Sequence, residues 1–217
     1  KSPGTALAYT DATGNLIQPN AVPGDFRFAD LSGPEGTPDG KIDEYDKTKI
    51  GKCTPDWTFG LNLNAEWKGF DLNMFWQGTR GNDIFDMTMR VDRQNQNLPN
   101  WMLGRWTGEG TSNDIPRYVV GNSGNMVASD LYVCDGSYLR LKNLQLGYTL
   151  PKRLTQKAFI DRLRFDVMAE NLVTFTKYQG YDPETAYQGG DQGATTGSIG
   201  NNYPLVSTYT GGIELTF

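Results

Sequence analysis

The sequence predicts an all-β protein whose antiparallel strands form part of a transmembrane β-barrel. Two segments carry this prediction. Residues 57–67 alternate apolar and polar side chains over a length that suits a tilted crossing of a bilayer. Within residues 205–217, polar and apolar side chains fall on opposite faces from Thr208 onward, and the segment ends on Phe217, where a barrel would close its wall. The alternative for this last segment is an edge strand of a soluble β-sandwich that happens to end in Phe.

The composition agrees with a polar, β-rich protein and removes several classes of function. The chain has 217 residues with 26 Gly, 11 Tyr and no His, and its formal net charge is -5. An acidic chain is a poor partner for nucleic acid. Without His, an enzyme would have to rest on paired carboxylates, and no pair stands out, so we expect no enzymatic activity. The mean hydropathy is -0.54, and no apolar run is long enough for a membrane helix.

A hairpin is expected directly after the first strand. Residues 70–77 alternate again after a tight Lys68–Gly69 connection, which is typical of a two-residue turn. Trp57 and Trp67 place aromatic side chains at both ends of the apolar face, as an interfacial girdle requires.

Two further strands are expected before the last one. The apolar residues of 138–150 change phase once, so a bulge is expected near Lys142–Asn143. Pro151 then ends that strand. Residues 163–175 form the other strand, since the side chains of 163–170 alternate, and they complete a set of five strands.

The alternation assigns each side chain to a face. We expect one set to contact lipid and the other to face the lumen, because neighbouring side chains of a strand point to opposite faces. The lipid set contains Leu61, Leu63, Leu72, Met74, Ile213 and Leu215. The lumen set contains Asn62, Asn64, Asp71, Asn73, Glu214 and Thr216.

Connection lengths predict the orientation of the strands. The turn at 68–69 and the stretch 152–162 are short, whereas 78–132 and 177–203 are long. Short connections of outer-membrane barrels face the periplasm, so the chain is expected to finish at the periplasmic rim. Five strands are too few to close a barrel, so residues 1–217 are expected to be the C-terminal portion of a larger one. A small complete barrel with another strand in residues 1–9 is the alternative.

Ten short strings follow one another in the order of a known family. They are PGDFRFAD (23–30), DGKID (39–43), PDWTFGLN (55–62), GFDL (69–72), FWQG (75–78), GNDI (81–84), DGSYLRLKN (135–143), LGYTLP (146–151), ENL (170–172) and GYDPE (180–184). Together they resemble the C-terminal quarter of a SusC/RagA-type TonB-dependent transporter of Bacteroidetes outer membranes. The resemblance runs from about residue 23 to the last residue.

The resemblance implies a twenty-two-stranded barrel with long extracellular loops and a plug domain that is absent from this chain. It implies import of glycans or peptides across the cell outer membrane. The partners that it implies are a SusD-like surface lipoprotein, a TonB complex acting through the missing N-terminal region, and outer-membrane lipid. A soluble calcium-stabilised β-domain that binds carbohydrate is the alternative function.

Residues 25–50 are expected to form an acidic extracellular loop with a structural Ca2+ site. An EF-hand-like loop places ligand oxygens at positions 1, 3, 5, 7, 9 and 12 and Gly at position 6. Residues 39–43 and 46 fit the later positions, whereas 30 and 32 fit the first two only across an insertion. The candidate ligands are Asp30, Ser32, Asp39, Lys41 through its carbonyl, Asp43 and Asp46. The family commonly reads Asp-x-Asn-Gly-Asp-Gly here, so the chain departs from its pattern, and a solvated acidic turn is the alternative.

The remaining candidates are two cysteines and the aromatic residues of the long loops. Cys53 and Cys134 each lie four residues before a strand, and either a disulfide or two free thiols is compatible with the sequence. The loop aromatics are Trp101, Trp106, Tyr118, Tyr178, Tyr181, Tyr187 and Tyr203. Each could serve as a platform for a sugar ring or pack its own loop together.

Overall fold

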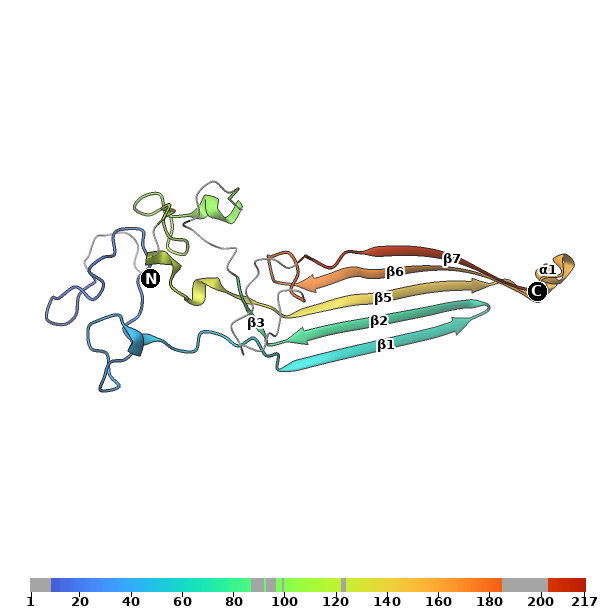
Figure 1. Ribbon diagram of the computed structural model, residues 1–217, viewed down its shortest axis with the longest axis horizontal. Coiled ribbons are helices and arrows are strands. Elements are labelled where there is room, and N and C mark those ends of the chain that lie inside the picture. Colours follow the sequence, from blue (N-terminus) through green and yellow to red (C-terminus); the bar gives the residue numbers. More distant parts are fainter. Residues whose placement is uncertain (1–8, 87–91, 93–96, 99, 122–123, 185–202) are drawn as a thin grey trace. The chain divides into compact units, whose positions relative to one another are not determined.

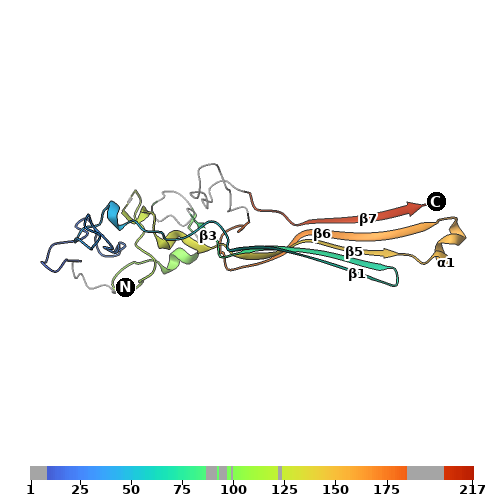
Figure 2. The same ribbon diagram turned by 90° about the horizontal axis from the view of Figure 1, so that it is seen from below.

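Five antiparallel strands form one sheet in the order β1-β2-β5-β6-β7 (Figure 1). The strands are β1 (Trp57–Trp67), β2 (Phe70–Arg80), β5 (Tyr138–Thr149), β6 (Arg162–Thr176) and β7 (Thr208–Thr216). Figure 2, turned by 90°, shows that the sheet is twisted along its length. The predicted antiparallel sheet is confirmed. β1 and β7 are its two open edges, so these strands by themselves do not close a barrel.

The computed structural model describes residues 9–86, 92, 97–98, 100–121, 124–184 and 203–217. The chain divides into two units. The sheet unit contains residues 51–88 and 130–217, and the loop unit contains residues 1–50 and 89–129. The five strands therefore belong to the first unit, and the acidic segment belongs to the second.

The β1–β2 hairpin closes through the predicted two-residue turn. Trp67 pairs with Phe70 across it, and Lys68 and Gly69 have φ angles of 48° and 88°. Positive φ at both positions is what a type I′ turn requires, and the twist of this turn matches that of the flanking strands. A side chain at position 69 is also excluded sterically, because its Cβ would lie 2.7 Å from the carbonyl oxygen of Thr149.

The expected bulge is present and disturbs two neighbouring ladders. The register of β5 shifts between Leu141 and Asn143 against β6, and the ladder with β2 shifts beside the same residues. Lys142 is therefore the extra residue of β5 relative to β2, and Asn171 of β6 takes a left-handed φ of 50°. A bulge re-aims the side chains around it. Here it keeps the leucines on both sides of Lys142 on one face of the sheet.

Pro151 and two short helical turns join β5 to β6. Pro151 has a φ of -60° and precedes α1 (Lys152–Thr155), which continues as the 3-10 turn η6 (Gln156–Ala158). Phe159 ends this segment with a left-handed φ of 59°. The connection is short, as predicted, and lies at the same end of the sheet as the β1–β2 turn (Figure 1).

The structure contains a second, two-stranded sheet that the sequence did not predict. β3 (Asp83–Phe85) pairs antiparallel with β4 (Val133–Asp135) inside the long connection between β2 and β5. Ile84 is 1% exposed and packs with Tyr178 and Cys134. Strands of three residues are too short to give a period-two signal, which explains why they were missed.

Side-chain contacts rather than regular structure hold the described part of the loop unit together. Among the described residues before β5, the 3-10 turns are η1 (Glu44–Asp46), η3 (Asn100–Gly104), η4 (Gly124–Met126) and η5 (Asp130–Tyr132), the last of them in the sheet unit. Asp25 accepts hydrogen bonds from Arg117 Nε at 2.6 Å and from Asn125 Nδ2 at 2.9 Å. Burial raises the pKa of Asp25, but these bonds outweigh it and leave the pKa below its usual value. Gly24 lies so close to the Trp106 ring that a Cβ would collide with it.

Candidate functional site

One face of the five-stranded sheet is apolar and exposed. The ladder registers place on it Leu61, Leu63, Leu72, Met74, Ile213 and Leu215, the whole set expected to face lipid. Leu61 is 52% exposed and Ile213 is 67% exposed, so the described residues leave this face largely uncovered. Monomeric soluble proteins rarely expose a contiguous apolar surface of several strands. The face therefore needs a membrane or another apolar surface against it.

Aromatic side chains border the apolar face at both ends. Near the short connections, the ring centroids of Phe70 and Tyr148 lie 4.4 Å apart. Lys68 Nζ lies 4.7 Å from the centroid of the Trp67 ring. At the other end of β1, Trp57 is 72% exposed. Aromatic rings with a cation beside them suit the interface between lipid and water.

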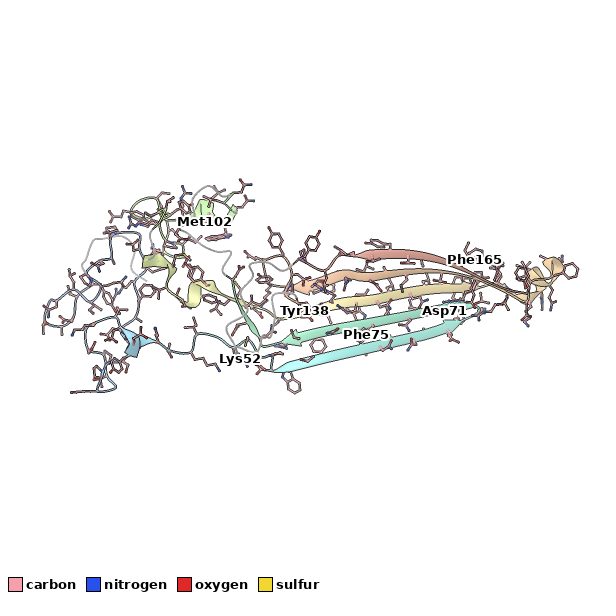
Figure 3. The ribbon with its side chains drawn as sticks, in the orientation of Figure 1. Lys52, Asp71, Phe75, Met102, Tyr138 and Phe165 are labelled. Carbon is pink, nitrogen blue, oxygen red and sulfur yellow. The ribbon has the colours of Figure 1, made fainter. Side chains whose placement is uncertain are left out.

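The opposite face is polar and carries an ion-pair network near the short connections. Arg164 Nη2 lies 2.7 Å from Asp71 Oδ2, and Arg164 Nη1 lies 3.5 Å from Asp166 Oδ1. Asp71 lies near this end of the sheet (Figure 3). Gly147 of β5 separates the two pairing strands, and a Cβ there would lie 2.4 Å from both Asp71 Oδ1 and Arg164 Nη2. The ion pair between β2 and β6 therefore requires a glycine at this position.

The ladder registers also place the whole expected lumen set on the polar face. Its members are Asn62, Asn64, Asp71, Asn73, Glu214 and Thr216. Glu214 lies 3.5 Å from Arg162. The two predicted faces of the sheet are thus separated as the alternation requires.

A second network lies on the polar face near the long connections, close to the start of β5 at Tyr138 (Figure 3). Arg140 donates hydrogen bonds to Thr174 Oγ1, Asp182 Oδ1 and Glu184 Oε2, each at 2.7 Å. Lys142 Nζ donates to both oxygens of Glu184 at 3.0 and 3.2 Å. The side chains of Arg140 and Asp182 are 5% and 2% exposed, so their ion pair is buried.

The acidic segment folds so that its carboxylates accept backbone amides. Asp30 Oδ2 accepts from the Gly40 N–H at 2.8 Å, and Asp46 Oδ1 accepts from the N–H groups of Leu31 and Ser32 at 2.7 and 3.2 Å. The Asp43 N–H also donates to Asp46. This bond lowers the pKa of Asp46 most, and the bonds from Leu31 and Ser32 lower it further. Gly40 has a φ of 84°, which suits the sharp turn of a calcium loop.

The predicted ligands share this one segment, but their carboxylates do not converge. Asp39 accepts from the Lys41 N–H at 3.0 Å, and Asp43 accepts from the Tyr45 N–H at 2.8 Å. No three carboxylate or thiol side chains of the described residues are close enough together to hold a metal ion. Asp30 Oδ1, however, is buried and has no hydrogen-bond partner. The calcium site stays a prediction.

Comparison with known proteins identifies the group to which this chain is related. No protein-family model matches it. The chain is 37% identical to TonB-dependent receptor P3 of Formosa agariphila over 199 residues, which are 90% of this chain and 19% of the receptor. It is 28% identical to TonB-dependent receptor SusC of Bacteroides thetaiotaomicron, over 91% of this chain and 18% of SusC.

Solved structures agree with these relatives. The RagAB peptide transporter superposes with a TM-score of 0.66 at 29% identity, over 88% of this chain and 20% of the other. The open-open state of the RagAB peptide importer gives a TM-score of 0.62 at 30% identity, over 85% of this chain and 20% of the other. The chain is therefore a homologue of the SusC/RagA-type TonB-dependent receptors over most of its own length.

Homology to SusC and RagA places the protein in the outer membrane. The chain spans about a fifth of the length of the curated relatives that it matches. Among the described residues, no helix has the length and apolar character needed to cross a bilayer. The compared relatives are named as receptors and importers.

The other predicted candidates, the two cysteines and the loop aromatics, differ in how deeply they are buried. Cys53 and Cys134 are not joined by a disulfide. Burial raises the pKa of the Cys134 thiol, which makes it a poor nucleophile. Tyr178 is 6% exposed and donates to Asp86 at 3.2 Å, so it packs its own loop. Tyr181 and Tyr203 are each 80% exposed.

Three more of the loop aromatics are partly buried, and one lies outside the description. Trp101, Trp106 and Tyr118 are half-buried, which favours packing over a free platform. Tyr187 lies outside the described residues.

The sequence analysis missed both ion-pair networks. The alternation of their strands places Arg140 and Arg164 on the polar face, and this was the only indication of the networks in the sequence. Their partners could not be named from it, because Asp71 belongs to a strand that does not neighbour β6 and Asp182 follows β6 in a loop. Only the order of the strands brings these residues together.

Proposed function

We propose that the chain is a wall segment of an active transporter that imports a nutrient through the outer membrane. The observation that carries this proposal is a five-stranded sheet with one exposed apolar face and one ion-paired polar face. Lipid covers the first face, and the second lines the lumen. Energy comes from a TonB complex that acts through parts of the protein outside this chain.

The proposed orientation follows from the connections. The short connections face the periplasm and the long ones face the outside. Phe217 then lies at the periplasmic rim, one residue after the end of β7. The open edges of β1 and β7 pair with other strands of the same barrel.

We infer that the cargo is a glycan or a peptide and that a SusD-like lipoprotein takes part in its capture. The support is relatedness to SusC and to the RagAB peptide importer. Tyr181 and Tyr203 are the loop aromatics whose exposure suits contact with such a cargo, because an aromatic face stacks on a sugar ring or an apolar side chain. Both residues belong to the connection between β6 and β7.

Uptake by cells that carry the protein at its natural length tests this function. Uptake of labelled maltohexaose or of a labelled peptide mixture should require the protein and should stop when the proton-motive force is dissipated. Replacing Tyr181 and Tyr203 by Ala should raise KM. Phe159→Ala is the matched control, because Phe159 is 90% exposed but belongs to a short connection. Recovery of the intact protein in a detergent-free soluble fraction would contradict the proposal and support a soluble β-domain.

We also propose that the acidic segment binds one structural Ca2+ ion. The support is the unpaired, buried Asp30 Oδ1, since a buried carboxylate oxygen normally has a partner. Carboxylate oxygens are the ligands that Ca2+ prefers. Asp39 and Asp43 would have to leave their local amides to join Asp30 in the ligand set.

A calcium titration of the purified protein tests this site. Isothermal calorimetry should find one Ca2+ per chain, and Asp30→Asn should abolish that binding. Glu35→Gln is the control, because Glu35 is an exposed carboxylate of the same segment outside the ligand set. Unchanged binding after Asp30→Asn would contradict the assignment.

A further inference from the structure

β7 is shorter than the strand it pairs with, although its neighbouring residues are described. The ladder between them ends at the Glu170–Thr208 pair, while β6 continues to Thr176. The segment 205–217 was expected to be extended, and its alternation from Thr208 onward coincides with β7, whereas residues 205–207 lie outside the strand. Specific hydrogen bonds hold these three residues.

Side chains replace the missing ladder bonds of residues 205–207. The Leu205 N–H donates to Asp182 Oδ2 at 2.9 Å. Asn171 is the left-handed residue of β6. Its side-chain amide donates to the Val206 carbonyl at 3.2 Å, and its backbone carbonyl accepts from Ser207 Oγ at 2.8 Å. The segment before β7 is therefore bound by a bulge on one side and by a loop carboxylate on the other.

Asp182 in turn is fixed to the polar face of the sheet. Its Oδ1 accepts from Arg140 Nη2 at 2.7 Å and from the Glu184 N–H at 2.9 Å, while its Oδ2 holds Leu205. Arg140 also donates to Thr174 of β6. Asp182 is only 3% exposed, so water does not compete well for these bonds. One carboxylate thus joins the first and the last described parts of the β6–β7 connection.

We propose that the Arg140–Asp182 pair is a latch that positions both ends of the β6–β7 connection over the polar face and stops β7 from extending along β6. The pair acts through Leu205 rather than by touching cargo. The latch also fixes two exposed rings, since Tyr181 directly precedes Asp182 and Tyr203 lies two residues before Leu205. The use of these rings in cargo binding rests on the proposed transport function, whereas the latch itself does not.

Hydrogen exchange of the natural-length protein in detergent tests the latch without any cargo. Asp182→Asn keeps the size of the side chain and removes its charge. A hydrogen bond to a charged group contributes about 1.5–3 kcal/mol, so exchange at Leu205 should rise roughly tenfold or more. Peptides covering residues 209–216 should stay protected, which shows that the sheet has folded. Asp161→Asn is the matched control, because Asp161 pairs with Lys152 at 3.0 Å in an exposed position of the short connection.

A second variant separates the latch from a general loss of charge. Glu184 pairs with Arg140 and Lys142 but does not contact Leu205, and its side chain is 23% exposed. Glu184→Gln should therefore leave exchange at Leu205 within twofold of the wild type. Equal exchange at Leu205 in the wild type and in Asp182→Asn would overturn the proposal, as would an equal rise in Asp161→Asn. If Asp182→Asn raises exchange while the wild type transports nothing, the latch stands and the proposed function fails.

Discussion

A single arginine placed in the middle of β1 tests which face of the sheet meets lipid. Leu63 lies on the apolar face, pairs with Met74 and is 43% exposed. Asn64 is its direct neighbour on the polar face and pairs with Asn73. Leu63→Arg and Asn64→Arg therefore place the charge on opposite faces of the sheet, at nearly the same depth in the bilayer.

The position of Leu63 sets the size of the expected effect. β1 has 11 residues, and at about 3.4 Å per residue with a tilt of about 40° it spans roughly 28 Å, close to the apolar band of about 25 Å. Leu63 lies one residue from the strand's centre, where an arginine facing lipid costs about 2–4 kcal/mol. That cost lowers the ratio of folded to unfolded protein by roughly 30- to 700-fold. Asn64→Arg should change the free energy of unfolding by no more than about 0.5 kcal/mol.

Equilibrium unfolding in urea, with the protein in lipid vesicles, measures these free energies. Leu215→Arg adds a depth control, because Leu215 lies on the same face but next to the end of β7 and should cost only about 0–1 kcal/mol. Equal destabilisation by Leu63→Arg and Asn64→Arg would refute the assignment of faces. Equal costs for Leu63→Arg and Leu215→Arg would refute the proposed depth.

Three more outcomes are expected. Deleting Phe217 should lower the amount of heat-resistant barrel in membranes relative to total protein, and should barely change the stability of barrels already formed. If the deletion variant assembles as well as the wild type, Phe217 has no role in assembly. Gly147→Ala should lower the urea midpoint of unfolding, because a Cβ there would collide with the Asp71–Arg164 pair. Gly211→Ala should leave the midpoint unchanged, because a Cβ at that position meets no other atom. Burial raises the pKa of Asp182, but its hydrogen bonds with Arg140 and backbone amides lower it overall. Hydrogen-exchange protection at Leu205 should therefore be complete above about pH 4 and be lost as the pH falls through that lowered value.

Local features of the fold could be predicted because their causes are local. The Lys68–Gly69 turn follows from the residues that tolerate positive φ, and the faces of β1 follow from alternation alone. The bulge at Lys142 was visible as a change of phase. The Arg164–Asp71 pair depends instead on β5 lying between β2 and β6, and no period in the sequence encodes that order.

The start of β7 shows how a buried charge acts beside a local pattern. Leu205 keeps the apolar phase of β7, whereas Val206 and Ser207 are out of phase with it, so the alternation begins only at Thr208. A ladder hydrogen bond contributes about 0.5–1.5 kcal/mol net, whereas one to a charged group contributes about 1.5–3 kcal/mol. The Leu205 N–H therefore gains more from Asp182 than from β6, provided that Arg140 keeps that carboxylate ionised and in place. The strand boundary is set by an arginine that lies 65 positions earlier in the chain, as the numbering of Arg140 and Leu205 shows. Residues 205–217 in isolation show the change of phase at Val206 and Ser207, but not the carboxylate that binds Leu205.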